Sequence, residues 1–172
     1  MDFYETIAIR SSIRSYSSAQ VEEEKLQRVL EATRLAPSAM NDQPWKLILV
    51  RDELLKGQLA EACDGQSFVA EAPVAVVLCG LPARGRIGGY TDSTMVDGAI
   101  AMTHLVLAAA AEGLGTCWLG AFDNDEVKDL LGIPSQVQVV AVTPLGYPRQ
   151  ALKRNSKRRK SLDELVCEDK FK

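Results

Sequence analysis

The ten residues from Gly113 to Phe122 constrain the fold of this chain more than any other stretch. They follow a long, mostly apolar run over residues 99–111. Gly113 and Gly115 predict the end of a helix and a tight turn. Residues 116–119 then predict a buried strand, so we expect the chain to pass here from a core helix into a core strand.

The predicted strand leads into a pair of small residues, Gly120 and Ala121. Small residues at a strand end let a flat ligand approach the backbone closely, because no side chain stands in the way. Taken alone, the stretch favours a simpler interpretation, in which Gly113 caps the helix and Gly120 makes a β-bulge. The rest of the sequence has to decide between the two.

Hydrophobic spacing predicts helices and strands along the whole chain, separated by turn residues. The second helix is expected to begin after a cap at Ser17 or Ser18 and to end before Pro37. No internal repeat or linker interrupts the pattern, so residues 1–172 are predicted to form one domain. The other predicted helices cover residues 2–9, 52–63, 95–112 and about 124–131, and the predicted strands cover residues 46–50, 74–79, 116–119 and 137–145.

Composition and charge argue against several classes of protein. Of the 172 residues, 47% are apolar and 25% are charged, which is ordinary for a soluble globular domain. The net charge of −3 implies no general attraction to nucleic acid, with a basic cluster at residues 153–160 as the exception. The longest uncharged run, between Asp97 and Glu112, falls short of the roughly 20 residues that a membrane span needs.

The cysteines point to a reducing compartment. Cys63, Cys79, Cys117 and Cys167 are far apart and form no C-x-x-C pair, which argues against a zinc or iron–sulfur site. Cys117 is predicted to be a buried, inert thiol, because no neighbour in the sequence would activate it. No signal peptide is recognisable. We therefore expect a cytoplasmic protein with no metal site and with no nucleic-acid or membrane partner.

Two polar stretches are candidates for ligand binding. Residues 10–14 read Arg-Ser-Ser-Ile-Arg, which fits either a solvated loop or a cradle for an anion such as a phosphate ester. Residues 36–45 form a rigid loop with two prolines, two amides and a tryptophan, and such a loop is often only a connector. The glycine-rich residues 82–94 are the expected lid. His104, inside the apolar helix, is expected to be a packed, hydrogen-bonded histidine.

The sequence lacks the motifs of several common enzymes. It has no P-loop, and the glycines at 113 and 115 do not complete a dinucleotide-binding pattern. A single histidine argues against a catalytic triad and against multi-histidine metal sites. The remaining features suit a flat, phosphorylated cofactor that carries its own chemistry.

At this point the chain resembles the FMN-dependent nitroreductase family over nearly its whole length. Each motif alone is weak, but their order and approximate spacing follow those of the family. The resemblance implies an α+β fold with a central, mostly antiparallel sheet flanked by helices, and an intertwined homodimer with FMN at the subunit interface. The motifs that carry it are residues 10–14, 36–45, 113–120, 145–148 and 157–160.

The resemblance also implies a phosphate site. Arg10 and Ser12, with Ser11 adjacent, would bind the ribityl phosphate of FMN. Lys157 and Arg159 would close on the same phosphate from the tail. These roles agree with the chemistry of the residues, because guanidinium groups and hydroxyls are good phosphate ligands.

Other residues would contact the flavin ring. Arg14 would lie near its N1/O2 edge, where a cation stabilises the negative charge of the reduced flavin. Gln66 would meet the pyrimidine ring, and the backbone of Gly120 and Ala121 would face N5. A loop from the other subunit would reach the same flavin with Pro37, Ser38, Ala39 and Asn41.

The function implied is that of an FMN-dependent oxidoreductase with ping-pong hydride transfer. NADH or NADPH would deliver hydride to N5, and a nitro compound, quinone or similar small molecule would take it up. No side chain is expected to act as a catalytic acid or base. The alternatives are a flavin-dependent reductase of another type, for example a dehalogenase-like enzyme, and a non-catalytic flavin-binding or sensor protein.

Overall fold

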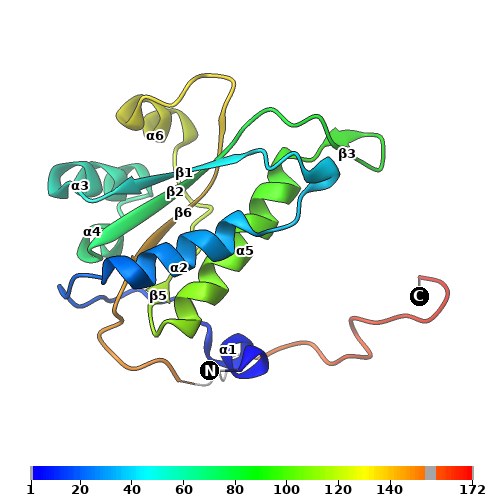
Figure 1. Cartoon of the computed structure of the whole chain (residues 1–172), viewed down its shortest axis with the longest axis horizontal. Helices are drawn as coiled ribbons and strands as arrows, with labels where there is room; N and C mark the ends of the chain where they lie inside the picture. Colours follow the sequence, from blue (N-terminus) through cyan, green and yellow to red (C-terminus); the bar gives the residue numbers. More distant parts are fainter. Residues whose placement is uncertain (1, 154–157, 172) are drawn as a thin grey trace.

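A four-stranded sheet forms the centre of the computed structural model, which describes residues 2–153 and 158–171. Every neighbouring pair of strands is antiparallel, and helices flank the sheet (Figure 1). The predicted α+β fold with a mostly antiparallel sheet is therefore confirmed. The strand order is β1-β2-β6-β5, and the strands are β1 (Trp45–Val50), β2 (Val74–Gly80), β6 (Gln138–Gly146) and β5 (Gly115–Thr116).

The central strand β2 serves two cores, one on each face of the sheet. All of its residues are buried. Successive side chains on a strand point to opposite faces, so Ala75 and Val77 enter one cluster whereas Val74 and Val76 enter the other. Because both faces of β2 are buried, its sequence is apolar at every position, which is the pattern that predicts a strand covered on both faces.

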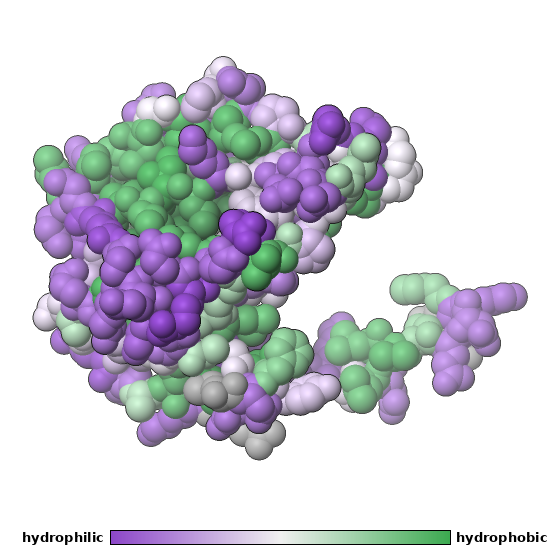
Figure 2. Space-filling model, viewed as in Figure 1, coloured by the Kyte–Doolittle hydropathy of each residue, from purple (hydrophilic) through white to green (hydrophobic). Residues whose placement is uncertain are grey.

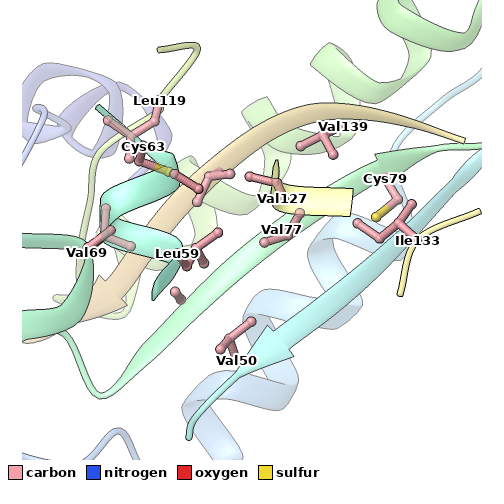
Figure 3. Close-up of a cluster of buried hydrophobic side chains, with 14 of the residues drawn as sticks. Val50, Leu59, Cys63, Val69, Val77, Cys79, Leu119, Val127, Ile133 and Val139 are labelled. Atoms are coloured by element: carbon pink, nitrogen blue, oxygen red, sulfur yellow. The ribbon is translucent and has the colours of Figure 1, made fainter. Parts of the chain in front are cut away.

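Each core is closed by its own helices. The first cluster is covered by α3 (Glu53–Ala62), α4 (Phe68–Glu71) and α6 (Asn124–Leu131). Figure 3 shows Leu59, Val69 and Val127 from these helices around Val77 of the sheet. On the other face lie α2 (Glu23–Arg34) and α5 (Thr94–Ala111), which pack side by side (Figure 1).

A β-bulge brings α5 close to the sheet. The register of β6 against β2 shifts between Leu78 and Cys79, which leaves Val140 as an extra residue. A Cβ atom on Gly98 of α5 would lie 2.9 Å from Cγ2 of Val140. A larger residue at position 98 would therefore displace the side chains of the sheet beneath it.

The end of α5 follows the prediction at Gly113. Gly113 has a φ of +76°, its N–H donates to Ala110 O at 3.0 Å, and the Leu114 N–H donates to Ala109 O at 2.8 Å. These two bonds make the glycine-terminated Schellman motif. The predicted packing of His104 is also confirmed, because its Nδ1 lies 3.1 Å from Ala32 O.

The strand predicted over residues 116–119 was wrong in length. Only Gly115 and Thr116 form β5, and Leu119 rejoins the sheet through one isolated bridge to Val142. In between, the Cys117 N–H donates to the hydroxyl of Thr143 at 3.1 Å instead of to a backbone carbonyl, which interrupts the ladder. The prediction that Cys117 is buried is confirmed, at 1% exposed.

The start of the second helix was also predicted wrongly. Helix α2 begins at Glu23, and neither Ser17 nor Ser18 caps it. The Ser17 N–H donates to Tyr147 O at 2.9 Å, so this part of the chain is held against the turn after β6 and cannot enter a helix.

Three further features have no counterpart in the prediction. They are the four-residue α4, a short 3-10 helix η1 (Ala39–Asn41) in the loop after α2, and a hairpin of β3 (Arg86–Ile87) and β4 (Thr91–Asp92) inside the expected lid. Gly88 and Gly89 take positive φ at its tip. Elements this short contain too few residues to show a period in the sequence.

Among the described residues, α5 is the one helix long and apolar enough to cross a bilayer. Half of its 18-residue window is buried inside the structure, against α2 and the sheet. Such burial is also what the core helix of a folded domain shows.

We expect the thiols of Cys63 and Cys79, both drawn in Figure 3, to resist alkylation in the folded protein. Burial raises the pKa of Cys63 to about 12 and raises that of Cys79 above its ordinary value. The thiolate is the reactive form, and at pH 9 a pKa of 12 leaves only about one Cys63 in a thousand ionised. Mass spectrometry after iodoacetamide at pH 9 should find both residues unmodified in native protein and modified in urea. Rapid native labelling would contradict the packing.

Candidate functional site

The segment from Ser12 to Tyr16 is fixed to the edge of the sheet. Ser12 forms a parallel bridge with Thr116 of β5, and the Ile13 N–H donates to Thr116 O at 2.8 Å. Gly115 lies directly under Ile13, where a Cβ atom would come within 2.9 Å of Ile13 Cγ1. The backbone of the candidate cradle is therefore held in one position by the stretch that follows α5.

Tyr16 holds the far end of this segment from inside the core. Its side chain is 1% exposed, and its hydroxyl donates to Ile13 O at 2.8 Å. Its N–H donates to Glu71 Oε2 of α4 at 3.1 Å. Burial strongly raises the pKa of the Tyr16 phenol, so the hydroxyl stays neutral and remains a donor.

A cavity of about 520 Å³ opens beside the segment. Two arginines, Arg14 and Arg149, line it. The wall suits a ligand with an anionic end, because two arginines and two serines line it beside the apolar Ile13 and Pro148. The lining residues are Ser12, Ile13, Arg14, Ser15, Pro148, Arg149 and Gln150.

The two arginines of the cavity are held by different contacts. The Arg14 guanidinium carbon lies 6.0 Å from the centre of the Phe68 ring of α4, at the limit of a cation–π contact. Arg149 donates from Nε to Tyr16 O at 3.1 Å, and its Nη2 lies 4.0 Å from Glu71 Oε2. Helix α4 thus supports both cations.

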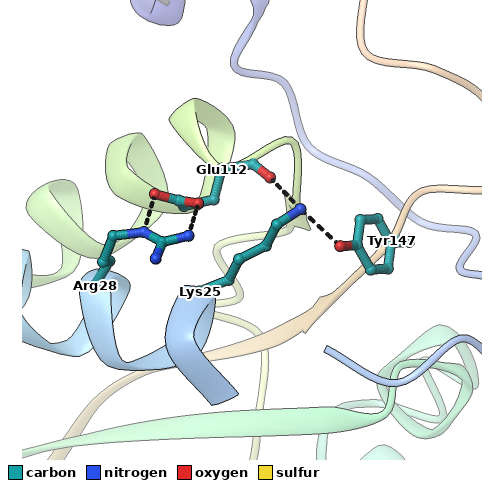
Figure 4. A network of polar contacts seen from close by, with 4 residues as sticks. All are labelled: Lys25, Arg28, Glu112 and Tyr147. Atoms are coloured by element: carbon teal, nitrogen blue, oxygen red, sulfur yellow. Dashed lines mark hydrogen bonds and ion pairs between the residues drawn. The ribbon is translucent and has the colours of Figure 1, made fainter. Parts of the chain in front are cut away.

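A network of polar contacts fixes the turn that carries Pro148 and Arg149 (Figure 4). Lys25 Nζ donates to the hydroxyl of Tyr147 at 2.7 Å and to Glu112 O at 3.2 Å. Arg28 makes a bidentate pair with the Glu112 carboxylate at 2.7 and 2.8 Å, which holds the pKa of that carboxyl below its usual value. The network therefore joins α2, the end of α5 and the turn after β6.

Gln66 and Ala121 come together although 55 positions separate them. Gln66 Nε2 donates to Cys63 O at 2.9 Å and, at 3.4 Å, to Ala121 O. Gly120 is exposed, and a Cβ atom there would meet nothing within 4 Å. Packing within this chain thus gives no reason for a glycine at position 120.

The loop at residues 37–41 lies away from this cavity. It follows the C-terminal end of α2, while the cavity segment precedes the N-terminal end (Figure 1). A helix of 12 residues is about 18 Å long. One copy of the chain therefore does not bring Pro37, Ser38, Ala39 or Asn41 to Ser12 and Arg14.

The remaining predicted ligands are also apart from the cavity wall. Arg10 ends α1 (Phe3–Ile9), and Ser11 follows it, but neither lines the cavity. Arg159 lies with Arg158, Lys160 and Glu164 around a separate cavity of the tail. Figure 1 shows this tail running away from the body. The predicted ligand Lys157 lies outside the described residues.

Hydrophobic side chains are exposed on the tail and on α1. Figure 2 shows green, hydrophobic groups on the projecting tail, and exposed apolar residues there include Leu162 and Phe171. Phe3 and Tyr4 of α1 are 65% and 81% exposed. Large apolar groups without cover are typical of surfaces that meet another protein.

Sequence reasoning missed Arg149, Phe68 and Glu71. Arg149 could have been found, because it directly follows the recognised motif at residues 145–148. Phe68 and Glu71 carried no signal, since they lie on a helix of four residues that only the fold brings next to the cavity.

Comparisons with known proteins agree on one family. The family model described as Nitroreductase family matches residues 7–79 and 61–147. An Archaeoglobus fulgidus protein, provisionally named NADH dehydrogenase/NAD(P)H nitroreductase, is 37% identical over 148 residues, which cover 83% of each chain. The FMN reductase [NAD(P)H] of Bacillus subtilis is 31% identical over 80% of this chain and 62% of its own length.

A solved structure shares the fold. The crystal structure of a nitroreductase family protein from Clostridium novyi superposes with a TM-score of 0.82 and 37% identity, covering 87% of this chain and 86% of that chain.

Proposed function

The chain belongs to the nitroreductase family, and we propose that it is an FMN-dependent oxidoreductase that uses NADH or NADPH as electron donor. The name of the Bacillus subtilis relative, an FMN reductase acting with NAD(P)H, supports this donor and this flavin. The acceptor is a nitro compound, a quinone or a similar small molecule. The observation that carries the proposal is the cavity lined by two arginines at the edge of the sheet.

The cavity residues fit FMN. Its volume of about 520 Å³ falls in the range of pockets for small ligands and cofactors. The hydroxyl of Ser12 would bind the phosphate end, together with Arg10, which precedes the cavity segment but does not line the cavity. Arg14 would lie at the N1/O2 edge of the ring, where its charge would favour the reduced form. When bound, FMN supplies the redox chemistry at N5, accepting hydride from the donor and passing it to the acceptor.

The protein contributes positions and charges. No Asp, Glu, His or Cys is among the described residues that line the cavity, so its wall has no general acid or base. Gln66, held beside Ala121, orients the pyrimidine end of the ring. Gly120 would leave the backbone open toward N5, and a Cβ atom at this position would meet nothing within 4 Å in this chain.

The complete site requires two copies of the chain. The loop at residues 37–41 and the tail with Arg159 both lie away from the cavity of their own chain. The exposed apolar residues of α1 and the tail, together with Met95 and Val96 at 47% and 42% exposed on α5, suit burial by a second copy. We place the homodimer, with FMN at its interface, in the cytoplasm as a soluble enzyme.

Purified protein tests this proposal. It should be dimeric, take up FMN, and bleach its flavin absorbance when NADH or NADPH is added without oxygen. Sustained turnover with a quinone or a nitroaromatic compound separates an enzyme from a non-catalytic flavin protein, which would be reduced once and stop. Failure to bind FMN, or a bound flavin that neither nicotinamide reduces, would refute the proposal.

A further inference from the structure

The loop at residues 38–43 has an unusual backbone. Met40, Asn41 and Gln43 have φ values of +57°, +53° and +51°. This is a left-handed backbone conformation that residues other than glycine rarely adopt. Three such residues within four positions need support from their surroundings. Without that support, the loop would relax to other conformations.

Most of the loop's support comes from inside it. Ser38 Oγ accepts from the Gln43 N–H at 2.9 Å, and Gln43 Nε2 donates to Asn41 O at 3.0 Å. Asp42 pairs with the exposed Arg84 at 2.7 Å. The Arg84 N–H also donates to Asp42 Oδ2 at 2.8 Å, so the Asp42 side chain, 11% exposed, ties the loop to the segment before β3.

Asp97, in the first turn of α5, makes the buried contact. Its side chain is 2% exposed, and its Oδ1 accepts from the Ala39 N–H at 3.0 Å. The surroundings are tightly packed, since a Cβ atom on Gly85 would lie 2.6 Å from Ala39 Cβ and 2.7 Å from Ser93 Oγ. The start of the loop is therefore held by a carboxylate inside the protein, and its Asp42 is held by Arg84.

Burying this carboxylate costs free energy, because it loses its contacts with water. No ion pair involves Asp97 among the described residues, and its Oδ2 has no hydrogen-bond partner there. The N-terminus of α5 offers some compensation through the helix dipole. A neutral residue would fit the fold at lower cost, so the charge is best explained by what it holds.

We propose that Asp97 is a positioning residue that fixes the loop of one subunit in the conformation that contacts the flavin of the other. The assignment rests on the proposed function, because that function gives the loop its ligand. A carboxylate accepts a hydrogen bond from the Ala39 N–H more strongly than a neutral oxygen would. It holds the strained backbone before FMN arrives, so FMN binding does not have to order the loop.

The first test measures FMN affinity in the full-length protein. Asp97→Ala should raise the FMN dissociation constant by about tenfold or more, the effect of losing a hydrogen bond to a charged group. Asp97→Asn keeps an oxygen acceptor but loses the charge, so its dissociation constant should fall between those of the wild type and Asp97→Ala. Val127→Ala, a core truncation on α6, is the matched control and should lower the melting temperature while leaving FMN affinity unchanged.

The second test needs no variant. Hydrogen exchange of the wild-type apoprotein should show the Ala39 amide already protected, and FMN should add protection elsewhere in the loop. Protection of Ala39 that appears only with FMN, or wild-type affinity in Asp97→Ala, would overturn the assignment. Flavin uptake and reduction by the wild type test the proposed function separately, so the two failures are distinguishable.

Discussion

Replacing Gly115 by valine is expected to lower the free energy of unfolding by about 1–3 kcal/mol, the usual cost of overpacking a core, and to weaken FMN binding. A Cβ atom at this position would lie within 2.9–3.1 Å of three atoms of Ile13. Relief of that clash must move the backbone of residues 12–14. Ser12 and Arg14 would then leave their places at the cavity wall.

Urea denaturation and flavin titration measure the two effects of Gly115→Val. Gly57→Ala is the control, because a Cβ atom at this α3 position meets nothing within 4 Å. Alanine should even stabilise the helix there by about 0.5–1 kcal/mol. A Gly115→Val protein with wild-type stability and FMN affinity would show that β5 does not fix the cradle.

Replacing Arg10 by alanine is expected to weaken FMN binding by about 1.5–3 kcal/mol, the contribution of a hydrogen bond to a charged group. That range corresponds to roughly a 10- to 150-fold higher dissociation constant. Arg10 ends α1 and lies two positions before Ser12. Its pairing with phosphate is a prediction from the sequence, because Arg10 does not line the cavity of the single chain.

The Arg10→Ala effect should be specific to the ligand. Stability should change little, since Arg10 takes part in no ion pair among the described residues. Arg51→Ala removes an arginine that pairs with the exposed Glu23 and serves as the control for net charge. Equal FMN affinity in Arg10→Ala and the wild type, measured by quenching of flavin fluorescence, would refute the phosphate role.

Local patterns predicted much of the fold. The apolar sequence of β2 predicted a strand buried on both faces, and Gly113 predicted the end of α5. These features depend on residues close to one another in the chain. The start of α2 and the length of β5 depend on partners far away, Tyr147 and Thr143, and were predicted wrongly for that reason.

The candidate site also contains residues that a local motif predicted and residues that only distant contacts bring in. The motif at residues 10–14 marked the cradle, and the structure places Ser12 and Arg14 at the cavity wall. Arg149 and the supporting Phe68 and Glu71 were missed, because their contacts cross 54 or more positions of sequence.

The stretch from Gly113 to Phe122 shows what the sequence by itself determined about this protein and what was left to the tertiary structure. Its glycines determined where the helix ends, because a positive φ is a local property of the backbone. Only the fold decided that Gly115 supports Ile13 and that Ala121 meets Gln66. Such contacts depend on which segments the two cores bring together, and no local pattern contains that information.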